Sequence, residues 1–151
     1  MKKYFSLITF FVLSFTLLLV SCDKDKDPAP KTKTQLLVQA NWKFKTATAN
    51  GGDVSILIND CQKDNLLSFS ASGAGNVNEG ASKCTVTDPN DIPFTWSFAS
   101  GETIINVSTP LFANGGTSFT LISLTETDLV VEMPYNPPVG ASILMKVTFM
   151  H

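Results

Sequence analysis

Hydrophobic and polar residues alternate along most of the chain after residue 33. A period of two residues is typical of β-strands that bury one face and expose the other. No long helix is predicted in this region. The positions expected to face inward are Trp42, Phe44 and Thr46; Leu67 and Phe69; Phe94, Trp96 and Phe98; Ile105 and Val107; Phe119 and Leu121; Leu129, Val131 and Met133; and Ile143, Met145, Val147 and Phe149.

Residues that favour turns separate these runs. Pro134, Pro137 and Pro138 predict a stiff loop before the last strand. Short strands at intervals of about ten residues, joined by tight turns, favour an all-β, eight-stranded antiparallel up-and-down barrel over a sandwich. The predicted turns are Asn50-Gly51-Gly52, Ser72-Gly73-Ala74-Gly75, Ser100-Gly101, Asn114-Gly115-Gly116 and Glu126-Thr127-Asp128.

One short helical segment is predicted before the first strand. It runs from Thr34 to Ala40, with Thr34 as the expected N-cap and an apolar patch that includes Leu37. A segment of this length forms little more than a single turn, which suits a plug at one end of a barrel.

The first 21 residues have the pattern of an export signal. Lys2 and Lys3 precede an apolar run from Tyr4 to Val20. This run is nearly long enough to span a bilayer, so an uncleaved membrane anchor is the alternative. We favour cleavage, because a plain anchor has no need of a cysteine at its exit.

Leu19, Val20, Ser21 and Cys22 together resemble a bacterial lipobox. That resemblance implies cleavage before Cys22 and attachment of acyl chains such as palmitate to this residue. Two or three chains anchor a protein stably, whereas one alone gives marginal binding. We therefore expect a lipoprotein held in the outer membrane, on its periplasmic face or at the cell surface.

Residues 22–33 are expected to form a disordered tether, since alternating Asp and Lys residues with two prolines cannot bury apolar area. The predicted domains are thus the signal peptide 1–21, the lipidated cysteine with its tether 22–33, and the barrel 34–151. After cleavage the chain retains nine lysines and thirteen acidic residues, and it has no arginine. With a net negative charge and no cluster of basic residues, the protein is not expected to bind nucleic acid. We expect it to be a monomer.

Cys61 and Cys84 remain once Cys22 carries lipid. Paired cysteines in an exported chain normally form a disulfide, and we predict one between them. The alternative, a metal or redox pair, lacks both a Cys-x-x-Cys spacing and a nearby histidine.

Several residues at matching spacings resemble the lipocalin-like lipoproteins of Gram-negative bacteria. The likeness covers about residues 34–151 and implies an eight-stranded barrel whose broader relatives carry small apolar molecules. Two features differ from lipocalins proper: Ala40-Asn41-Trp42 replaces Gly-x-Trp, and no arginine is present to stack on that Trp. The residues that carry the resemblance are Leu37, Trp42, Cys61, Asp64, Asn65, Leu67, Phe69, Cys84, Trp96, Leu124 and Leu129.

The sequence favours binding over catalysis. His151 is the only histidine and the last residue, and the common nucleotide, zinc and hydrolase motifs are absent. We therefore predict no enzyme activity, no catalytic residue, no metal and no cofactor. Asp88 with Asp91, and Asp60 with Asp64, have the spacing of an acid/base pair, but solvated loops explain them better.

Two functions remain open. In the first, an apolar cavity inside the barrel binds a small apolar ligand. In the second, the same side chains fill the barrel, and the protein is an interaction or accessory module that uses loops such as 88–91 or 135–138. The residues predicted to line the cavity are Trp42, Phe44, Phe69, Trp96, Phe98, Phe119, Met133, Met145 and Phe149.

Overall fold

The computed structural model describes residues 29–151. Within it Lys31–His151 forms one compact unit. The predicted signal peptide, Cys22 and most of the predicted tether lie outside the described residues, so the export and lipidation of the chain stay predictions. Between residues 29 and 151 no helix is both long and apolar enough to cross a bilayer.

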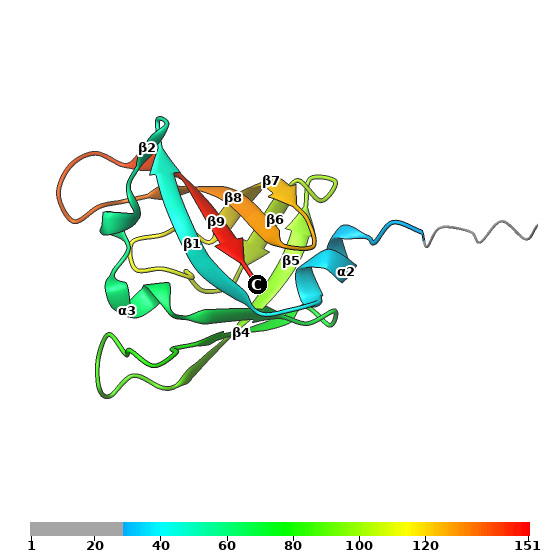
Figure 1. Cartoon of the computed structure of the whole chain (residues 1–151), viewed down its shortest axis with the longest axis horizontal. Helices are drawn as coiled ribbons and strands as arrows, with labels where there is room; N and C mark the ends of the chain where they lie inside the picture. Colours follow the sequence, from blue (N-terminus) through cyan, green and yellow to red (C-terminus); the bar gives the residue numbers. More distant parts are fainter. Residues whose placement is uncertain (1–28) are drawn as a thin grey trace, which may run out of the picture. The chain divides into compact units, whose positions relative to one another are not determined.

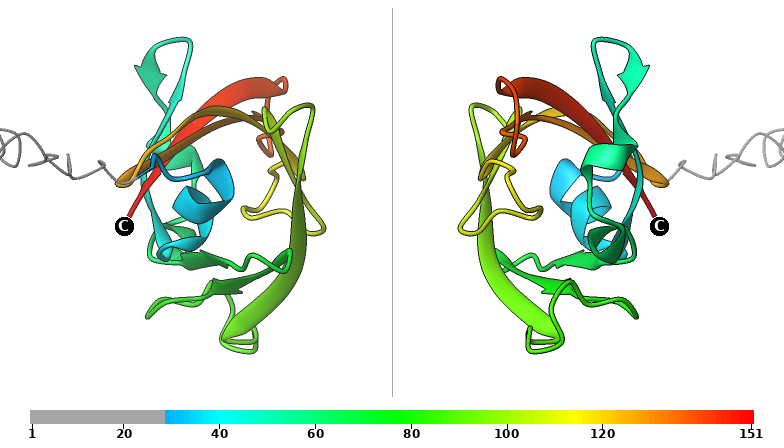
Figure 2. Two further views of the ribbon diagram at one scale, coloured as in Figure 1. Left: turned by 90° about the vertical axis from the view of Figure 1, so that its right-hand side faces the viewer. Right: turned by 90° about the vertical axis from the view of Figure 1, so that its left-hand side faces the viewer.

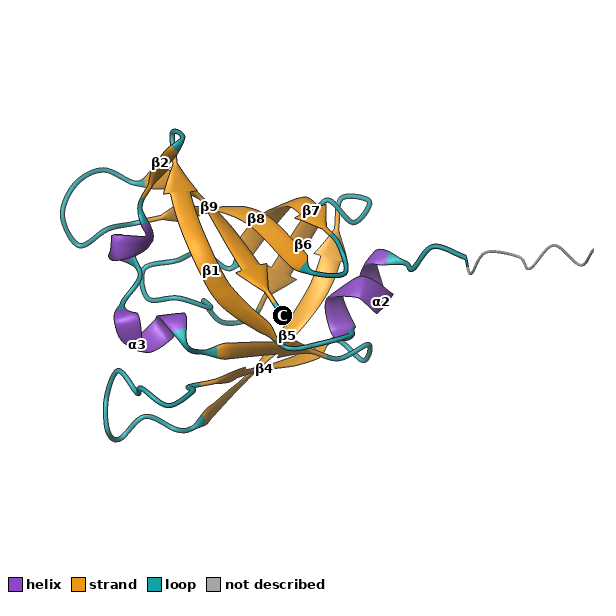
Figure 3. Cartoon of the chain, in the orientation of Figure 1, coloured by secondary structure: helices purple, strands orange, loops and turns teal. Residues whose placement is uncertain are grey.

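The strands of this unit form one antiparallel sheet in which, apart from the short β2, chain neighbours are sheet neighbours (Figures 1 and 3). β1 also pairs with β9, which closes the sheet. β2 pairs only with the end of β1, so the closed barrel has eight strands, as predicted. The strands are β1 (Trp42–Ala49), β2 (Gly52–Asp53), β3 (Leu66–Phe69), β4 (Ala74–Asn78), β5 (Asp91–Ala99), β6 (Ile104–Val107), β7 (Ser118–Leu124), β8 (Asp128–Tyr135) and β9 (Ile143–Met150).

The helices are short. α2 spans Lys33–Val38, the 3-10 helix η2 spans Ser55–Leu57, and α3 spans Asp60–Lys63. The predicted N-cap Thr34 is wrong, because Thr32 caps α2. Its hydroxyl accepts from the Gln35 amide at 3.2 Å, while Gln35 Oε1 accepts from the Thr32 amide at 2.8 Å. This reciprocal pair is a capping box, with Gln in the third helical position.

The two ends of the barrel differ in their connections. α2 lies across one end, where tight turns join β3 to β4, β5 to β6 and β7 to β8 (Figure 2). Lys33 Nζ donates to the carbonyl of Glu102 in one of these turns, and Gln39 donates to that of Glu126 in another. The opposite end carries α3 and the long connections 79–90, 108–117 and 136–142.

The inward faces of the strands follow the predicted alternation almost throughout. β7, where a register shift against β8 lies between Leu121 and Ser123, departs from it, and so does β1. A register shift against β9 between Phe44 and Thr46 changes the phase of the strand, so Ala47 is buried and Thr46 is only half-buried. A bulge adds one residue to one strand of a pair, which a strict period of two cannot anticipate.

Several residues of the predicted turns and loops belong to strands instead. Ala74 and Gly75 belong to β4, where Gly75 pairs with Phe94 and the Phe94 ring lies against the glycine Cα. Pro134 belongs to β8, opposite Leu144. The pairing of β7 with β8 reaches only to Thr120 and Glu132, so Pro134 is near a strand end where a missing amide is tolerated.

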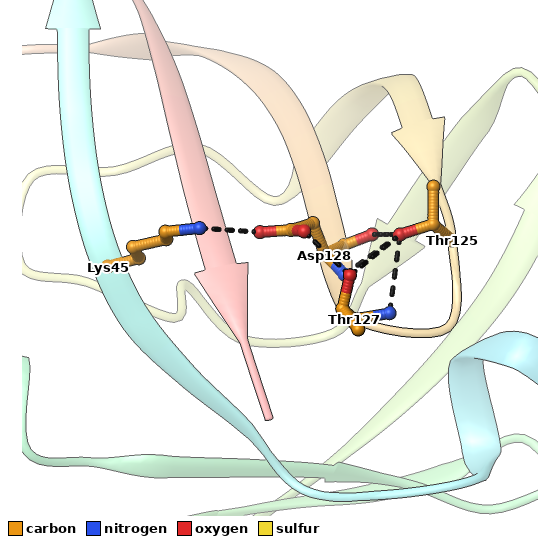
Figure 4. Close-up of polar contacts among 4 residues, drawn as sticks. All are labelled: Lys45, Thr125, Thr127 and Asp128. Atoms are coloured by element: carbon orange, nitrogen blue, oxygen red, sulfur yellow. Dashed lines mark hydrogen bonds and ion pairs between the residues drawn. The ribbon is translucent and has the colours of Figure 1, made fainter.

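Lys45 on β1 reaches past β9 to Asp128 at the start of β8 (Figure 4). The Lys45 ammonium donates to Asp128 Oδ1 at 2.9 Å, and the Thr127 hydroxyl donates to Oδ2 at 2.8 Å. These hydrogen bonds, that of Lys45 first, lower the pKa of Asp128. Because the folded pKa is depressed, the pair stabilises the fold at neutral pH, and this contribution is lost as the pH falls through the folded pKa.

We expect Lys45→Ala to raise the pKa of Asp128 toward the usual value of about 3.9. The measurement is a carboxyl NMR titration of Asp128. Lys43→Ala, which removes an exposed lysine from the same strand, is the matched control and should leave the titration unchanged. An identical Asp128 curve in wild type and Lys45→Ala would contradict the assignment.

Candidate functional site

The nine residues predicted to line a cavity all lie in the hydrophobic core of the barrel. Seven are buried, and Phe44 and Phe98 are half-buried. Their rings contact one another edge to face, as in Phe69 with Trp96 at 5.7 Å and Trp96 with Phe98 at 5.3 Å between centroids. The structure thus brings these side chains together, and their contact with a ligand stays a prediction.

Trp42 anchors the end of the barrel that α2 covers. Its side chain is 0% exposed, and Nε1 donates to the carbonyl of Leu37 at 2.8 Å. The His151 ring packs edge-on against the indole, with 4.9 Å between centroids. The indole thus has an aromatic contact, and His151 is held against the fold.

The predicted disulfide between Cys61 and Cys84 is present, with 5.1 Å between the two Cα atoms. It joins α3 to the 79–90 connection. Asp64 adds to this link, because its Oδ2 accepts from the amides of Ala81 at 2.9 Å and Ser82 at 3.0 Å. The Cys-x-x-Asp-Asn segment therefore fixes α3 against the long connection that follows β4.

A pocket of about 250 Å³ lies beside this link, at the barrel end with the long connections. One of its lining side chains, Phe112, stacks on Phe149 with 5.8 Å between ring centroids, so part of the pocket wall belongs to the barrel core. Long loops over a rigid scaffold are where binding residues concentrate. The pocket is lined by Gln62, Asn65, Val77, Glu79, Ile92 and residues 109–114.

Two grooves of about 320 and 340 Å³ run along β3 with β4 and β5 with β6. Each is lined only by neighbouring residues of two adjacent strands, so each offers the wall of a sheet and no surrounding loops. The 250 Å³ pocket has walls from a helix, two strands and a loop. It is the better candidate site.

Glu79 is the distinctive residue of this pocket. Its side chain is 7% exposed, that of Asn65 is 5% exposed, and both line the pocket. Among the described residues no donor reaches Glu79 Oε2, which has no contact with solvent. A buried carboxylate without a donor is costly, so its presence here needs an explanation.

The Asn65 amide has two orientations to choose between. In one, its nitrogen makes a single long hydrogen bond of 3.4 Å to Glu79 Oε1. Turned over, the nitrogen donates to the carbonyl oxygens of Glu79 and Cys61, both at 3.2 Å. We assign the second orientation because it makes two hydrogen bonds in place of one and moves the Asn65 oxygen away from the two backbone carbonyl oxygens. The Asn65 oxygen then faces Glu79 Oε1.

The carboxylate pairs considered from the sequence have structural partners. Asp60 forms an ion pair with Lys63, and Asp91 accepts from Asn76 and Asn78, which lowers the pKa of each carboxyl. Within residues 29–151 no group of three His, Cys, Asp or Glu residues could hold a metal ion. Tyr135, the first residue of the predicted loop 135–138, is instead the last residue of β8; it is buried, and its hydroxyl donates to the carbonyl of Leu57 at 2.7 Å. Tyr135 therefore belongs to the framework of the barrel end.

Sequence reasoning missed Glu79 and the pocket around it. Glu79 stands in a polar stretch with no neighbouring apolar alternation, so nothing marks it as buried. Asn65 was identified only through the family resemblance. Leu111 and Phe112 are buried in the core from within a loop, outside any strand pattern.

The strand pairings define the class of this chain, a closed eight-stranded up-and-down β-barrel. No protein-family model matches the sequence, and no curated protein does. The solved structures that match include bovine odorant binding protein in complex with a selenium-containing odorant. That match has a TM-score of 0.46 and 13% sequence identity, and covers 83% of this chain and 75% of the other.

Proposed function

We propose that this protein is a lipid-anchored protein of the cell envelope whose barrel binds a small, largely apolar ligand at the end opposite α2. The observation that carries the proposal is the 250 Å³ pocket between α3, β4, β5 and the 109–114 loop. Its volume is just below the range of about 300–1,000 Å³ of pockets for drug-sized molecules, so the ligand is small.

The chemistry of the pocket supports this function. Val77, Ile92, Leu111 and Phe112 supply apolar contact area, while the polar residues of the lining supply hydrogen-bonding groups. Pockets of this kind obtain affinity from apolar burial and orientation from the polar groups. The disulfide beside the pocket suits an oxidising compartment, which agrees with the predicted export of the chain.

The accessory-module function is the second candidate. Ile56 and Val139, each 89% exposed, lie in the connections of the same barrel end. Large apolar side chains in contact with solvent are typical of surfaces that bind another protein. In that function these side chains make the contacts and the pocket holds no ligand.

We expect residues 31–151, expressed without the signal and purified under native conditions, to carry a small molecule that native mass spectrometry detects. Starting at Lys31 keeps the capping box and the ion pair of Lys31 with Glu126 at 2.8 Å. No bound molecule, together with no uptake of apolar dyes, would favour the accessory module. For the anchor, the full chain should incorporate labelled palmitate, and Cys22→Ser should not.

A further inference from the structure

We infer that the ligand of the 250 Å³ pocket carries a protonated amine, which binds between the carboxylate of Glu79 and the side-chain oxygen of Asn65. This inference rests on the proposed function and names the chemical class of the ligand. It starts from the two side chains already described, each more than nine-tenths buried and each lining the pocket.

The hydrogen bonds of the two side chains leave acceptors without donors. With the Asn65 nitrogen bound to two backbone carbonyls, the Asn65 oxygen and Glu79 Oε1 face each other across 3.4 Å. Oε2 of Glu79 has no donor within the described residues either. Two oxygens in this arrangement repel each other, and a group with several N–H donors that bonds to both from the pocket offsets the repulsion.

The surrounding charges favour a cation. Asp64, which binds the amides of Ala81 and Ser82 just after Glu79, has a second buried carboxylate oxygen with no donor among residues 29–151. The lysines of this region are engaged elsewhere: Lys63 binds Asp60 at 2.6 Å, and Lys83 binds the carbonyl of Asp88 at 2.8 Å. The wall of the pocket is therefore negative, and the low dielectric strengthens its attraction for a cation.

The remaining walls favour an organic cation over a metal ion. Glu79 is the only acidic residue that lines the pocket, whereas divalent metals collect several oxygen ligands. Val77, Ile92, Leu111 and Phe112 complete the walls, and they match a hydrocarbon body. By liquid volume the pocket has room for about eight waters, which fits an amine of about ten non-hydrogen atoms.

The test compares three probes of one shape, titrated into residues 31–151 by calorimetry: phenethylamine, 2-phenylethanol and phenylacetate. We expect the amine to bind at least tenfold more tightly than the alcohol, and the carboxylate to bind most weakly. Glu79→Gln, which keeps the shape and removes the charge, should abolish this preference, so that the amine and the alcohol bind with equal affinity. Glu102→Gln, which removes one charge at the α2 end, should keep the preference.

Amide shifts in NMR spectra of the wild-type protein give a second readout that does not depend on the variant folding. Phenethylamine should shift the signals of Asn65, Glu79 and residues 109–114. Shifts confined to other residues would overturn the inference.

Further outcomes separate this inference from the proposed function. If the amine and the alcohol bind equally well and Glu79→Gln changes neither affinity, the ligand pocket stands but the inference that its ligand is an amine is overturned. Calcium binding that Glu79→Gln abolishes, with no amine preference, overturns it in favour of a metal. If none of the three probes binds and no molecule co-purifies, the proposed function fails as well.

Discussion

Trp42→Ala is expected to remove about 3–5 kcal/mol from the free energy of unfolding. The indole is 0% exposed and touches both α2, through the Leu37 carbonyl, and the ring of His151. Alanine leaves a cavity there and an unpaired carbonyl. Since small domains have a margin of about 5–15 kcal/mol, the variant should be close to unfolding. Urea unfolding followed by circular dichroism measures the difference.

Trp42→Phe separates packing from hydrogen bonding. Phenylalanine keeps most of the buried ring but cannot donate to the Leu37 carbonyl, so we expect a loss of about 1–3 kcal/mol. Ligand binding at the opposite end should be unaffected in this variant. A loss below about 1 kcal/mol in Trp42→Ala would show that Trp42 does not anchor this end of the barrel.

Replacing both Cys61 and Cys84 with serine has the second largest expected effect. The disulfide closes a loop with a sequence separation of 23 residues, and in the chain-entropy model its removal costs about 3 kcal/mol. For a domain of this size the midpoint of thermal unfolding should fall by roughly 10 °C. Calorimetry of the wild-type and double-serine proteins tests this value.

The wild-type protein in reducing agent is the matched control, because it loses the same bond without a substitution. It should unfold at the same temperature as the double-serine variant. An unchanged midpoint in both would mean that the hydrogen bonds of Asp64 to Ala81 and Ser82 suffice to hold α3 in place.

The all-β class of the fold could be predicted because apolar and polar residues alternate along most strands, so that one face of each is apolar. This alternation is missing from a strand whose inner face is covered by a side chain of the neighbouring strand. β4 has Val77 as its one buried apolar residue, and the Phe94 ring of the neighbouring strand covers Gly75. The sequence therefore predicts a turn at Gly75, whereas this glycine makes room for an aromatic ring within the sheet.

The disulfide could be predicted because the predicted export signal implies an oxidising compartment in which two cysteines pair, and the bond between Cys61 and Cys84 confirms it. The pocket could not, because its walls come from segments that are far apart in the sequence. Phe112 reaches the core from a loop, and Glu79 is buried by its surroundings in three dimensions. Neither the two-residue alternation of a strand nor the composition of a loop predicts that such residues are buried.

The contrast between the tight turns beside α2 and the long connections around α3 has a practical consequence. Because the framework is closed by strand pairing and by α2, the exposed positions of segments 79–90, 108–117 and 136–142 can be randomised in a library, provided that the core residues Leu111 and Phe112 are retained. Retaining Cys84 within the first segment keeps its crosslink to α3. The barrel thus offers a scaffold onto which recognition of new small molecules can be grafted.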